Sequence, residues 1–412
     1  MKTPLLFLCH RIPYPPNKGD KIRSFHLLHH LSKHFTVYLA TFIDDPADWP
    51  WVPEVEKFCT ESLFLELRPW QATLRSLAGL FSGQALSVPY YGNRQMQRWV
   101  SEQVKAHDIQ HVLVFSSAMA QFALDPALGF ARKVVDFVDI DSDKWDQYAQ
   151  QKPYPMKAVY QREARKLFDF EQRLTEEFDA GLFVSSSEAD LFRQMVPGSA
   201  DKIGYYNNGV NSDYFCPLAD RQSPYTHGER VVVFTGAMDY WPNIDAALWF
   251  ADKVFPQLRD ACPDVSFYIV GSNPSREVSQ LARRAGIQVT GRVEDIRPYL
   301  QHADVAVAPM QIARGVQNKV LEAMAMELPV VVSQRGLEGI DCAVGEDLLL
   351  ADTPADYLDY ISRIFAGEFA PMGERARSHV KDAFDWDNNL PEVVLLLEQA
   401  GHAPVNVAVS HG

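Results

Sequence analysis

The sequence has few cysteines, and none is placed as a metal-binding or disulfide-forming pair would be. Its five cysteines (Cys9, Cys59, Cys216, Cys262 and Cys342) are scattered over 412 residues, without a Cys-x-x-Cys spacing. An odd, dispersed set argues against a disulfide framework and against a zinc site. It favours reduced thiols, and therefore a cytoplasmic protein.

Long apolar runs are also missing. No stretch approaches the roughly 18 uninterrupted apolar residues of a membrane-spanning helix. The N-terminal segment, MKTPLLFLCHRIPYPP, has only a short apolar run and no small-residue cleavage site. It predicts a first β-strand rather than a signal peptide.

Positive charge is scarce. The chain has 39 Lys and Arg residues against 53 Asp and Glu residues, and its net charge is −14. Nucleic-acid binding is driven by clustered positive charge, so this balance argues against nucleic acid as a partner. Residues 10–34 are an exception, because they hold five Lys or Arg residues and a single Asp.

What the chain does have is a regular alternation of short apolar runs and helical patterns, which is typical of parallel α/β sheets. Strands are predicted over residues 4–10, 36–42, 111–115, 133–139, 181–186, 231–238, 266–272, 287–291, 304–310 and 329–333. Helices are predicted over residues 21–34, 156–178, 244–258, 276–286, 294–303 and 318–326. The fold class is therefore α/β.

A length of 412 residues suits two domains of roughly 150 to 200 residues each. We predict a Rossmann-like domain over 1–206, a linker rich in turn formers over 207–230, and a second Rossmann-like domain over 231–380. Residues 381–412 are predicted to form a helix that packs back on the first domain, followed by a tail. Two such domains are expected to face each other across a cleft, with ligands at the carboxyl ends of the strands.

The segment ARGVQNKVLEAMAMELPVVVS (313–333) gathers polar residues where a helix begins. Gly315 would let the backbone approach a ligand, and the free N–H groups of the first helical turn suit a phosphate. Lys319 adds a positive charge, and the Glu322 carboxylate can accept two hydroxyl hydrogen bonds from a ribose. Diphosphate and ribose together describe a nucleotide. Taken alone, the same segment also fits an ordinary amphipathic helix with a surface Lys–Glu pair.

Several motifs occur in an order and spacing that resemble a known family. FTGAMDYWPNIDAALWF, IVGS, VTGRVEDIRPYLQHADVAVAPM and GVQNKVLEAMAMELPVVVS resemble the C-terminal domain of the two-Rossmann (GT-B) glycosyltransferases of family 4. In the first half, P-x-x-x-G-D, FVSSSEADLF and NNGVNSDYF agree with this family. HRIPYPPNKGDKIRS, VDFVDIDSDKW and ARGVQNKVLEAMA are similar, more narrowly, to sugar transferases associated with exosortase (PEP-CTERM) exopolysaccharide systems.

The resemblance implies transfer from a nucleoside-diphosphate sugar with retention, without a cofactor or an obligatory metal. Glu322 matches the second Glu of the family's E-x7-E motif and would hold the ribose, and Lys319 would contact the diphosphate. The first Glu of the motif falls at position 314, where this chain has Arg314. That departure weakens any inference about the donor sugar, because an Arg could bind diphosphate or an acidic sugar instead.

The same resemblance implies a set of site residues. Those expected to bind the donor are Gly236, Arg292, Val293, Met310, Gly315, Val316, Asn318, Lys319 and Glu322. Those expected to act in catalysis are Lys319, Glu322, Arg314 and Asp139.

The loop PPNKGDKIRS (15–24) runs into the first predicted helix, and the matching loop of the family lies near the donor phosphate and the acceptor. The acceptor-binding residues expected here are Asn17, Lys18, Gly19, Asp20 and Arg23. A solvated basic loop is the alternative. The family usually has two adjacent glycines at this point, whereas this chain has Gly19 followed by Asp20.

VDFVDIDSDKW (135–145) contains overlapping D-x-D patterns at Asp139, Asp141 and Asp143. In single-Rossmann glycosyltransferases such a motif holds a divalent cation, because hard oxygen ligands suit it. That fold would leave the second half of this chain unexplained. In the two-domain family a catalytic His often lies nearby, and Asp139 or Asp141 could replace it; a helix cap is an equal alternative. His10, after the first strand, also points to the cleft in principle.

The segment 68–91 is rich in Leu, Trp, Phe and Tyr. As a helix it would align Trp70, Leu74, Leu77 and Phe81 in one stripe. Such a stripe is more often part of the core, but it also fits a membrane-contacting surface or a lipid-acceptor surface.

The expected function is that of a cytoplasmic glycosyltransferase, peripheral to the inner face of the membrane, that acts in exopolysaccharide synthesis. Its expected partners are the nucleotide-sugar donor, a glycan or polyprenyl-diphosphate-linked acceptor, and a membrane surface, with no nucleic acid. Two rivals remain open. One is a non-hydrolysing nucleotide-sugar 2-epimerase, and the other is a non-catalytic nucleotide-sugar-binding protein. Fold alone does not separate them.

Overall fold

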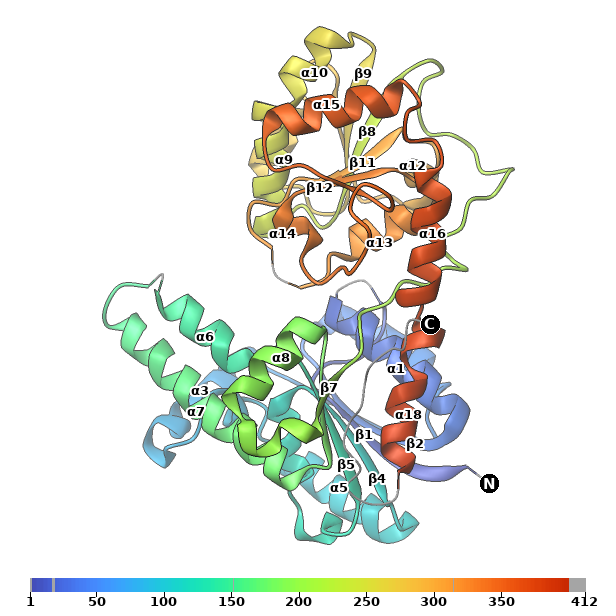
Figure 1. The fold of residues 1–412 in the computed structure, drawn as a ribbon. Coiled ribbons are helices and arrows are strands. Elements are labelled where there is room, and N and C mark those ends of the chain that lie inside the picture. The colour runs from blue at the N-terminus through green and yellow to red at the C-terminus, as the bar shows by residue number, and fades with distance from the viewer. Residues whose placement is uncertain (1, 17–18, 151, 314, 400–412) are drawn as a thin grey trace. The chain divides into compact units, whose positions relative to one another are not determined.

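The computed structural model describes residues 2–16, 19–150, 152–313 and 315–399. The chain forms two compact units, shown in Figure 1. The first unit comprises residues 1–207 and 390–412, and the second comprises residues 208–389. The chain thus passes between the units twice, after Asn207 and after Asn389.

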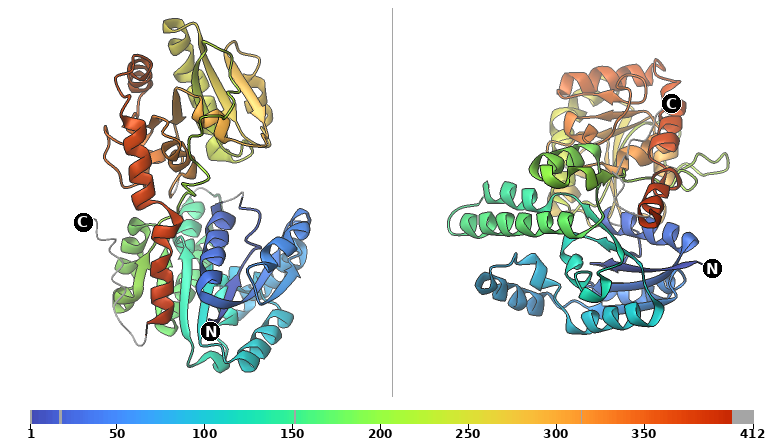
Figure 2. Two further views of the ribbon diagram at one scale, coloured as in Figure 1. Left: turned by 90° about the vertical axis from the view of Figure 1, so that its right-hand side faces the viewer. Right: turned by 60° about the horizontal axis from the view of Figure 1, so that its bottom comes forward.

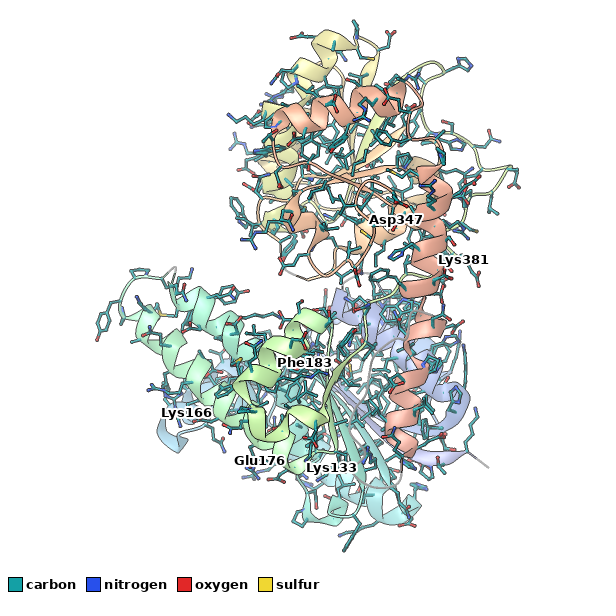
Figure 3. The ribbon with its side chains drawn as sticks, in the orientation of Figure 1. Lys133, Lys166, Glu176, Phe183, Asp347 and Lys381 are labelled. Atoms are coloured by element: carbon teal, nitrogen blue, oxygen red, sulfur yellow. The ribbon has the colours of Figure 1, made fainter. Side chains whose placement is uncertain are left out.

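The first unit is built on a seven-stranded parallel sheet of order β3-β2-β1-β4-β5-β6-β7. Its strands are β1 (Thr3–Cys9), β2 (Phe35–Ile43), β3 (Glu61–Glu66), β4 (His111–Phe115), β5 (Arg132–Val138), β6 (Ala180–Phe183) and β7 (Ile203–Tyr205). The central strands are buried on both faces, which explains why they appear in the sequence as continuous apolar runs. Phe183, labelled in Figure 3, stacks on Phe137 and packs against Phe192 within this core.

The helices of the first unit cover that sheet. They are α1 (Gly19–His34), α2 (Val52–Glu56), α3 (Pro69–Ser82), α4 (Ser87–Tyr90), α5 (Arg94–His107), α6 (Asp141–Gln150), α7 (Met156–Glu177), α8 (Ser186–Met195) and α18 (Pro391–Glu398), with short 3-10 turns η1 (Pro46–Trp51), η2 (Ser117–Phe122), η3 (Pro126–Leu128) and η4 (Pro197–Lys202). Helix α5 shows how a local side chain fixes the start of a helix. Asn93 caps its first turn by accepting bonds from the N–H groups of Gln95 and Met96.

Helix α18 belongs to the first unit although it comes last in the sequence. It packs on β4 and β5, as the views in Figure 2 also show. The Arg132 Nε donates to the Leu396 carbonyl at 3.0 Å, and the His111 Nδ1 lies 2.9 Å from the Leu397 carbonyl. Residues 400–412, predicted as a tail, lie outside the described part of the chain.

The second unit repeats the same topology with a six-stranded parallel sheet of order β10-β9-β8-β11-β12-β13. Its strands are β8 (Arg230–Thr235), β9 (Val265–Val270), β10 (Ile287–Gly291), β11 (Val305–Ala308), β12 (Val330–Val332) and β13 (Leu349–Leu350). Its helices are α9 (Trp241–Lys253), α10 (Phe255–Ala261), α11 (Arg276–Leu281), α12 (Arg297–Gln301), α13 (Asn318–Ala325), α14 (Gln334–Leu337), α15 (Pro354–Phe365), α16 (Met372–Ala383) and α17 (Trp386–Asn389).

Two expectations differ from the observed elements. The helix predicted over 244–258 is two helices, α9 and α10, which are separated at Val254. Pro256 follows the break, and a proline is tolerated only in the first turn of a helix, so it begins a new one. The sequence also did not reveal β3, β7 and β13, which are edge or near-edge strands.

The segment predicted as a linker over 207–230 lies mostly on the second unit. Gln301 of α12 accepts from the Leu218 N–H at 3.0 Å and donates to the Leu218 carbonyl at 2.7 Å. Tyr225 donates its hydroxyl to the Tyr299 carbonyl at 2.6 Å. The turn-forming residues thus make specific bonds to one unit, and the segment predicted as a linker belongs to the second unit from Asn208 onward.

Each sheet reverses its strand order once, between β1 and β4 in the first unit and between β8 and β11 in the second. In open parallel sheets, the carboxyl ends of the strands beside this reversal leave a crevice where ligands bind. A ligand-binding site is therefore expected in the loops that follow β1, β4, β8 and β11. No helix within the described ranges is both long and apolar enough to cross a membrane.

Candidate functional site

In the second unit, the structure brings three of the predicted donor residues together beside the strand reversal. Gly236 follows β8, Met310 follows β11, and Lys319 lies in the first turn of α13. Their side chains and backbone meet around the Lys319 ammonium group. This cluster, together with Asn243, is called the lysine site below.

The Lys319 ammonium group has uncharged partners in the lysine site. It donates a hydrogen bond to the Asn243 Oδ1, lies 3.9 Å from the Met310 sulfur, and sits 4.5 Å from the centre of the Phe234 ring. The Asn243 side chain is held in turn by a 2.9 Å bond from its Nδ2 to the Ala237 carbonyl. A positive charge set among an amide, a thioether and an aromatic ring is suited to an anionic ligand.

The ionisation of Lys319 and Glu322 is shifted in opposite directions. Burial lowers the pKa of the Lys319 ammonium group to about 7, against a smaller opposing effect of the Glu322 charge. Burial raises the pKa of the Glu322 carboxyl group to about 7, against the opposing effect of Lys319. Both groups therefore titrate near neutrality, and strongly perturbed groups of this kind cluster at functional sites.

Two glycines make the lysine site possible. A Cβ atom added to Gly236 would lie 2.7 Å from the Asn243 Nδ2 and 3.2 Å from the Lys319 Nζ. A Cβ added to Gly271, after β9, would lie 1.6 Å from the Gly236 carbonyl oxygen. Any larger residue at either position would push the loop after β8 away from Lys319.

The loop before α13 carries further predicted donor residues. Gly315 has a φ of 68°, which favours glycine, and an added Cβ there would meet nothing within 4 Å. The Asn318 Oδ1 is buried and has no hydrogen-bond partner among the described residues. Val316 packs against the core of the second unit. Arg314 lies outside the described residues, so the structure does not speak to its predicted role.

The structure does not bring Arg292 and Val293 into the lysine site. Both follow β10, which lies two strands away from β8 in the sheet. Arg292 is exposed, and Val293 packs against the core of the second unit. Their predicted contact with the base remains a prediction.

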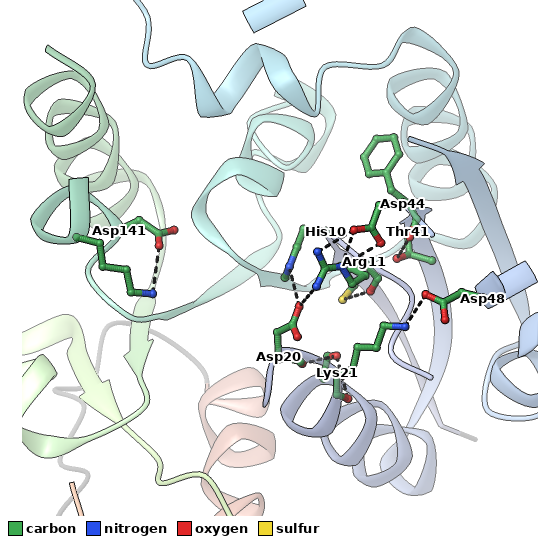
Figure 4. Close-up of polar contacts among 12 residues, drawn as sticks. His10, Arg11, Asp20, Lys21, Thr41, Asp44, Asp48 and Asp141 are labelled. Atoms are coloured by element: carbon green, nitrogen blue, oxygen red, sulfur yellow. Dashed lines mark hydrogen bonds and ion pairs between the residues drawn. The ribbon is translucent and has the colours of Figure 1, made fainter. Parts of the chain in front are cut away.

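In the first unit, four polar side chains meet after β1, as Figure 4 shows. Arg11 bridges two carboxylates, at 2.7 Å from the Asp20 Oδ2 and 2.7 Å from the Asp44 Oδ2. The His10 Nε2 lies 3.4 Å from the same Asp20 oxygen, and the His10 ring stacks on Phe115. His10, Arg11, Asp20 and Asp44 are called the paired cluster below.

Asp20 is the centre of the paired cluster. Burial by itself would raise the pKa of its carboxyl group, but the hydrogen bond with His10 and the charge of Arg11 outweigh this effect and hold the pKa well below its usual range. Next to it, Lys21 pairs with Asp48 at 2.5 Å, and both are buried. The lone His10 considered from the sequence is thus an imidazole that a carboxylate orients.

The prediction that Arg23 contacts an acceptor is wrong. Its guanidinium group is fully buried and forms a two-pronged pair with Asp136, at 2.9 Å and 3.2 Å. It also donates to the carbonyls of Tyr206 and Phe183, and Tyr206 donates its hydroxyl to Asp136. The planar guanidinium group of Arg23 thus binds a carboxylate with two hydrogen bonds inside the protein, which is a structural role.

The remaining predicted acceptor residues lie at the start of α1. Gly19 is the first residue of the helix, and a Cβ added there would meet nothing within 4 Å. Asp20 follows it and belongs to the paired cluster. Asn17 and Lys18 lie outside the described residues.

The aspartates after β5 are held by a lysine. Lys144 lies 2.5 Å from the Asp139 Oδ2 and 3.6 Å from the Asp141 Oδ1. Val138, immediately before them, has a φ of 70°, which is a strained conformation for a β-branched residue. Strain of this kind persists only where the surroundings enforce it, and it clusters at functional sites. The described residues contain no group of three or more His, Cys, Asp or Glu side chains placed to hold a metal ion.

Sequence reasoning missed several residues of these clusters. Asn243, which holds Lys319, lies in the first turn of α9, whereas the helix was predicted to begin at residue 244. The Pro242 before it could have moved the predicted start earlier, since proline favours the first turn. Arg11 and Asp44 come from separate segments, and no local pattern links them.

Known proteins resemble this chain in sequence and in fold. Residues 229–366 match the family model described as glycosyl transferases group 1. The match covers β8 to α15 of the second unit, and so it contains the whole lysine site.

A curated phosphatidyl-myo-inositol mannosyltransferase of Propionibacterium freudenreichii subsp. shermanii is 27% identical over 259 residues. That alignment covers 58% of this chain and 60% of the relative, so the chain spans less than two thirds of the relative's length.

Among solved structures, sucrose-phosphate synthase of Thermosynechococcus elongatus superposes with a TM-score of 0.70 at 18% identity, over 96% of this chain and 98% of the other. Anabaena HepE in complex with UDP superposes with a TM-score of 0.67 at 14% identity, over 96% and 99% of the two chains. At these identities the likeness establishes the fold, which is the GT-B fold with its two parallel sheets and interleaved helices.

Proposed function

We propose that this protein is a glycosyltransferase that moves a sugar from a nucleoside-diphosphate sugar to a lipid-linked glycan acceptor, with retention of configuration, in exopolysaccharide synthesis. The second unit holds the donor and the first holds the acceptor. The enzyme works at the cytoplasmic face of the membrane as a peripheral protein and needs neither a cofactor nor an obligatory metal.

The observation that carries this proposal is the lysine site. Lys319 has uncharged neighbours within bonding distance and follows the loop that begins α13. A diphosphate that binds there would neutralise the ammonium group and lie at the amino-terminal end of α13, where the helix dipole favours an anion. Glu322 lies one turn further along the same helix and would accept the ribose hydroxyls.

The protein contributes little covalent chemistry to the proposed reaction. The bond between the anomeric carbon and the diphosphate breaks, a bond from the same carbon to the acceptor oxygen forms, and the acceptor hydroxyl loses its proton. Negative charge develops on the departing diphosphate, so Lys319 and the N–H groups of α13 stabilise it where it forms.

On the acceptor side, the paired cluster offers an imidazole and a carboxylate at the end of β1. Asp20 is held ionised by His10 and Arg11, and Gly19 leaves open space beside it. Asp139 is fixed by Lys144 near a strained backbone. These residues would orient an acceptor hydroxyl and help to take its proton.

A family match and one solved structure favour the donor class. The family match is to glycosyl transferases group 1, and HepE has been solved with UDP and with UDP-glucose. A uridine nucleotide is therefore the first ligand to test. The mannosyltransferase relative acts, by its name, on a phosphatidyl-inositol lipid, which is in keeping with a lipid-linked acceptor.

The test is thermal unfolding of the protein with UDP, GDP, ADP and their sugar conjugates, for the wild type and for Glu322→Ala. A ligand that binds only the folded state adds roughly 2.7 kcal/mol of stability at a hundredfold excess over its dissociation constant. We expect one nucleotide to raise the melting temperature of the wild type and to have a much smaller effect on Glu322→Ala. Glu346→Ala, an exposed acidic residue of the same unit, is the matched control.

Product analysis then separates the reactions. A transferase releases the nucleoside diphosphate and needs an acceptor, whereas a 2-epimerase returns an isomeric nucleotide sugar without one. A non-catalytic binder would show the thermal shift and no turnover. If no nucleotide stabilises the folded wild-type protein, the proposed donor site is wrong.

A further inference from the structure

Helix α3 leaves a row of large apolar side chains in solvent. Trp70, Leu74 and Leu77 are 63%, 60% and 47% exposed, and their spacing places them on one face of the helix. The opposite side of α3 is occupied. Ala72 is fully buried, and the Ser76 hydroxyl donates to the Leu86 carbonyl at 2.8 Å. The exposed face is therefore not the side on which the helix packs into its own unit.

The residues around this face carry positive charge in an acidic protein. Residues 67–101 contain four arginines and no Asp or Glu, although 53 of the 412 residues of the chain are acidic. Residues 152–168, at the start of α7, add five Lys or Arg residues. The one acidic residue among them, Glu163, is buried and accepts from the N–H groups of Leu86 and Ser87.

These two segments form one surface. Arg162 of α7 donates to the Gly79 carbonyl of α3 at 2.9 Å and to the Gln84 carbonyl at 3.2 Å. Figures 1 and 2 show α3, α6 and α7 on the same side of the first unit. Two more exposed apolar side chains lie nearby, Tyr154 at 84% just before α7 and Met156 at 44% at its first position.

A pocket of about 570 Å³ opens between α3, α4, α5, η2 and α7. Arg75, Arg94 and Arg173 line it together with amide side chains, and its described lining contains no Asp or Glu. Arg75 donates to the Tyr90 carbonyl at 3.1 Å, but its Nε is buried without a partner among the described residues. Arg173 pairs with Glu177 at 2.8 Å, so a phosphate would bind Arg75 and Arg94, for which the described lining offers no carboxylate.

We propose that this surface docks the first unit on a membrane rich in anionic phospholipid. Trp70, Leu74 and Leu77 enter the boundary between head groups and acyl chains, as the apolar face of an interfacial helix does. The surrounding Lys and Arg residues are attracted to the anionic head groups, and one lipid phosphate occupies the arginine pocket. Arg68 pairs with Glu66 and Lys166 pairs with Asp169, but the other Lys and Arg residues of the two segments outnumber these pairs. An apolar face bordered by cations complements an anionic membrane surface, and this charge favours the lipid over an apolar protein partner.

The inference rests on the membrane-peripheral part of the proposed function and names the surface that performs it. The test is flotation of the full-length protein, without nucleotide, with three kinds of vesicle. One kind is phosphatidylcholine alone, the second adds phosphatidylglycerol, and the third adds polyprenyl phosphate in place of phosphatidylglycerol. Inorganic diphosphate in solution serves as a competitor that carries the charge without the chain.

We expect the wild-type protein to float with phosphatidylglycerol vesicles and much less with phosphatidylcholine alone. The double variant Leu74→Gln/Leu77→Gln should lower the partition coefficient by at least about tenfold, because two apolar side chains no longer enter the bilayer. Arg75→Gln/Arg94→Gln should lower it by roughly fivefold for each arginine. Arg94 is exposed, so the single variant Arg94→Gln is expected to fold. It provides a second test of the pocket if the double variant misfolds.

Phe130→Gln is the matched control. Phe130 is fully exposed in the same unit but lies before β5, at the amino edge of the sheet. If Phe130→Gln lowers binding to phosphatidylglycerol vesicles as much as the double variants do, the proposal is overturned. Equal binding of the wild type to neutral and anionic vesicles would also overturn it. Binding that requires polyprenyl phosphate would also overturn it and assign the pocket to the lipid-linked acceptor instead. If the protein binds free diphosphate in the absence of vesicles and this binding prevents flotation, the pocket is a site for soluble phosphate and the proposal is overturned.

The two proposals fail separately. Nucleotide stabilisation is measured without vesicles, and flotation is measured without nucleotide. Loss of flotation with an intact nucleotide response overturns the membrane surface alone. Intact flotation without any nucleotide response overturns the glycosyltransferase proposal alone.

Discussion

The two units share one type of strand order and differ in the partners of the cationic side chains at the carboxyl edge of the sheet. In the first unit, Arg11 lies between Asp20 and Asp44, and Arg23 is locked to Asp136. In the second unit, Lys319 contacts an amide, a thioether and an aromatic ring. The same fold therefore carries a neutralised edge in one unit and an electropositive edge in the other.

This difference indicates which ligand each unit can take. A cation already paired with carboxylates gains little from an anion, because the anion must compete with ligands that are in place. Lys319 has uncharged partners in direct contact, and the Glu322 charge affects it less than burial does, so an anion meets less competition there. The second unit is thus suited to a diphosphate, and the first to hydroxyl groups that hydrogen-bond to ionised carboxylates.

The largest expected effect tests the buried pair of the first unit. Asp136→Asn leaves Arg23 buried without its counter-charge, which should cost about 3–5 kcal/mol of stability. Hydrogen exchange of peptides from β5 would measure the loss in the first unit alone.

Glu54→Gln makes the same chemical change in the exposed pair with Lys57, so it should cost about 0–1 kcal/mol. If Asp136→Asn costs no more than this control, Arg23 does not depend on Asp136, and the guanidinium group would again be a candidate for ligand binding.

The second effect tests the lysine site. Lys319→Met removes a charge-assisted bond to the diphosphate, worth about 1.5–3 kcal/mol, or roughly a 10- to 150-fold loss of nucleotide affinity. Titration calorimetry with UDP would measure it.

Lys253→Met, at the exposed end of α9, is the control and should leave the affinity unchanged. Equal affinities for wild type and Lys319→Met would mean that the diphosphate binds elsewhere.

The third effect is a pH dependence that the second unit alone should show. The pKa of Lys319 lies at about 7 in the empty protein, and an anionic ligand raises it. Affinity should therefore fall as pH rises above 7, by up to about tenfold per unit. The pKa of Glu322 also lies at about 7, and hydroxyl bonds to its ionised form lower it, so affinity should also fall below pH 7.

UDP-glucose is the probe for this profile, since its diphosphate has no ionisation near neutrality. Affinity should peak near pH 7, and Glu322→Gln should flatten only the acidic side. A variant profile that keeps the acidic side would show that another group controls it.

The smallest expected effect compares two glycines. Gly19→Ala places its Cβ in open space at the start of α1, so the free energy of unfolding should stay constant or rise by up to about 1 kcal/mol. Gly236→Ala would press on Asn243 and Lys319 and should lower both stability and nucleotide affinity. The melting temperatures of the two variants measure the contrast, and a marked destabilisation by Gly19→Ala would contradict it.

Much of the donor side could be predicted from the sequence because it is local. Gly315, Lys319 and Glu322 lie within eight residues on one loop and helix, so their proximity follows from helical spacing alone. Asn243 could not be predicted in this way. It reaches Lys319 only because β8 and β11 are neighbours in the sheet, although they are far apart in the chain.

The acceptor side was harder to predict from the sequence, because its contacts join segments that are far apart in the chain. Arg23 stands in a basic, Gly-containing segment that resembles a ligand loop, and only the folded protein pairs it with Asp136, more than a hundred residues away. The stripe of α3 was also undecided. Its helical spacing is the same whether it faces a core or a membrane, and its exposure depends on what packs against it.

The sequence by itself determined the alternation of strands and helices, the two-domain organisation and the order of motifs along the second half. These follow from local propensity and from the period of apolar residues, which each segment carries alone. Only the tertiary structure decided which charges are neutralised, which side chains surround Lys319 and which face of α3 stays in solvent. These depend on contacts between distant segments, and the free energy of a charge or an apolar face is set by its neighbours in space.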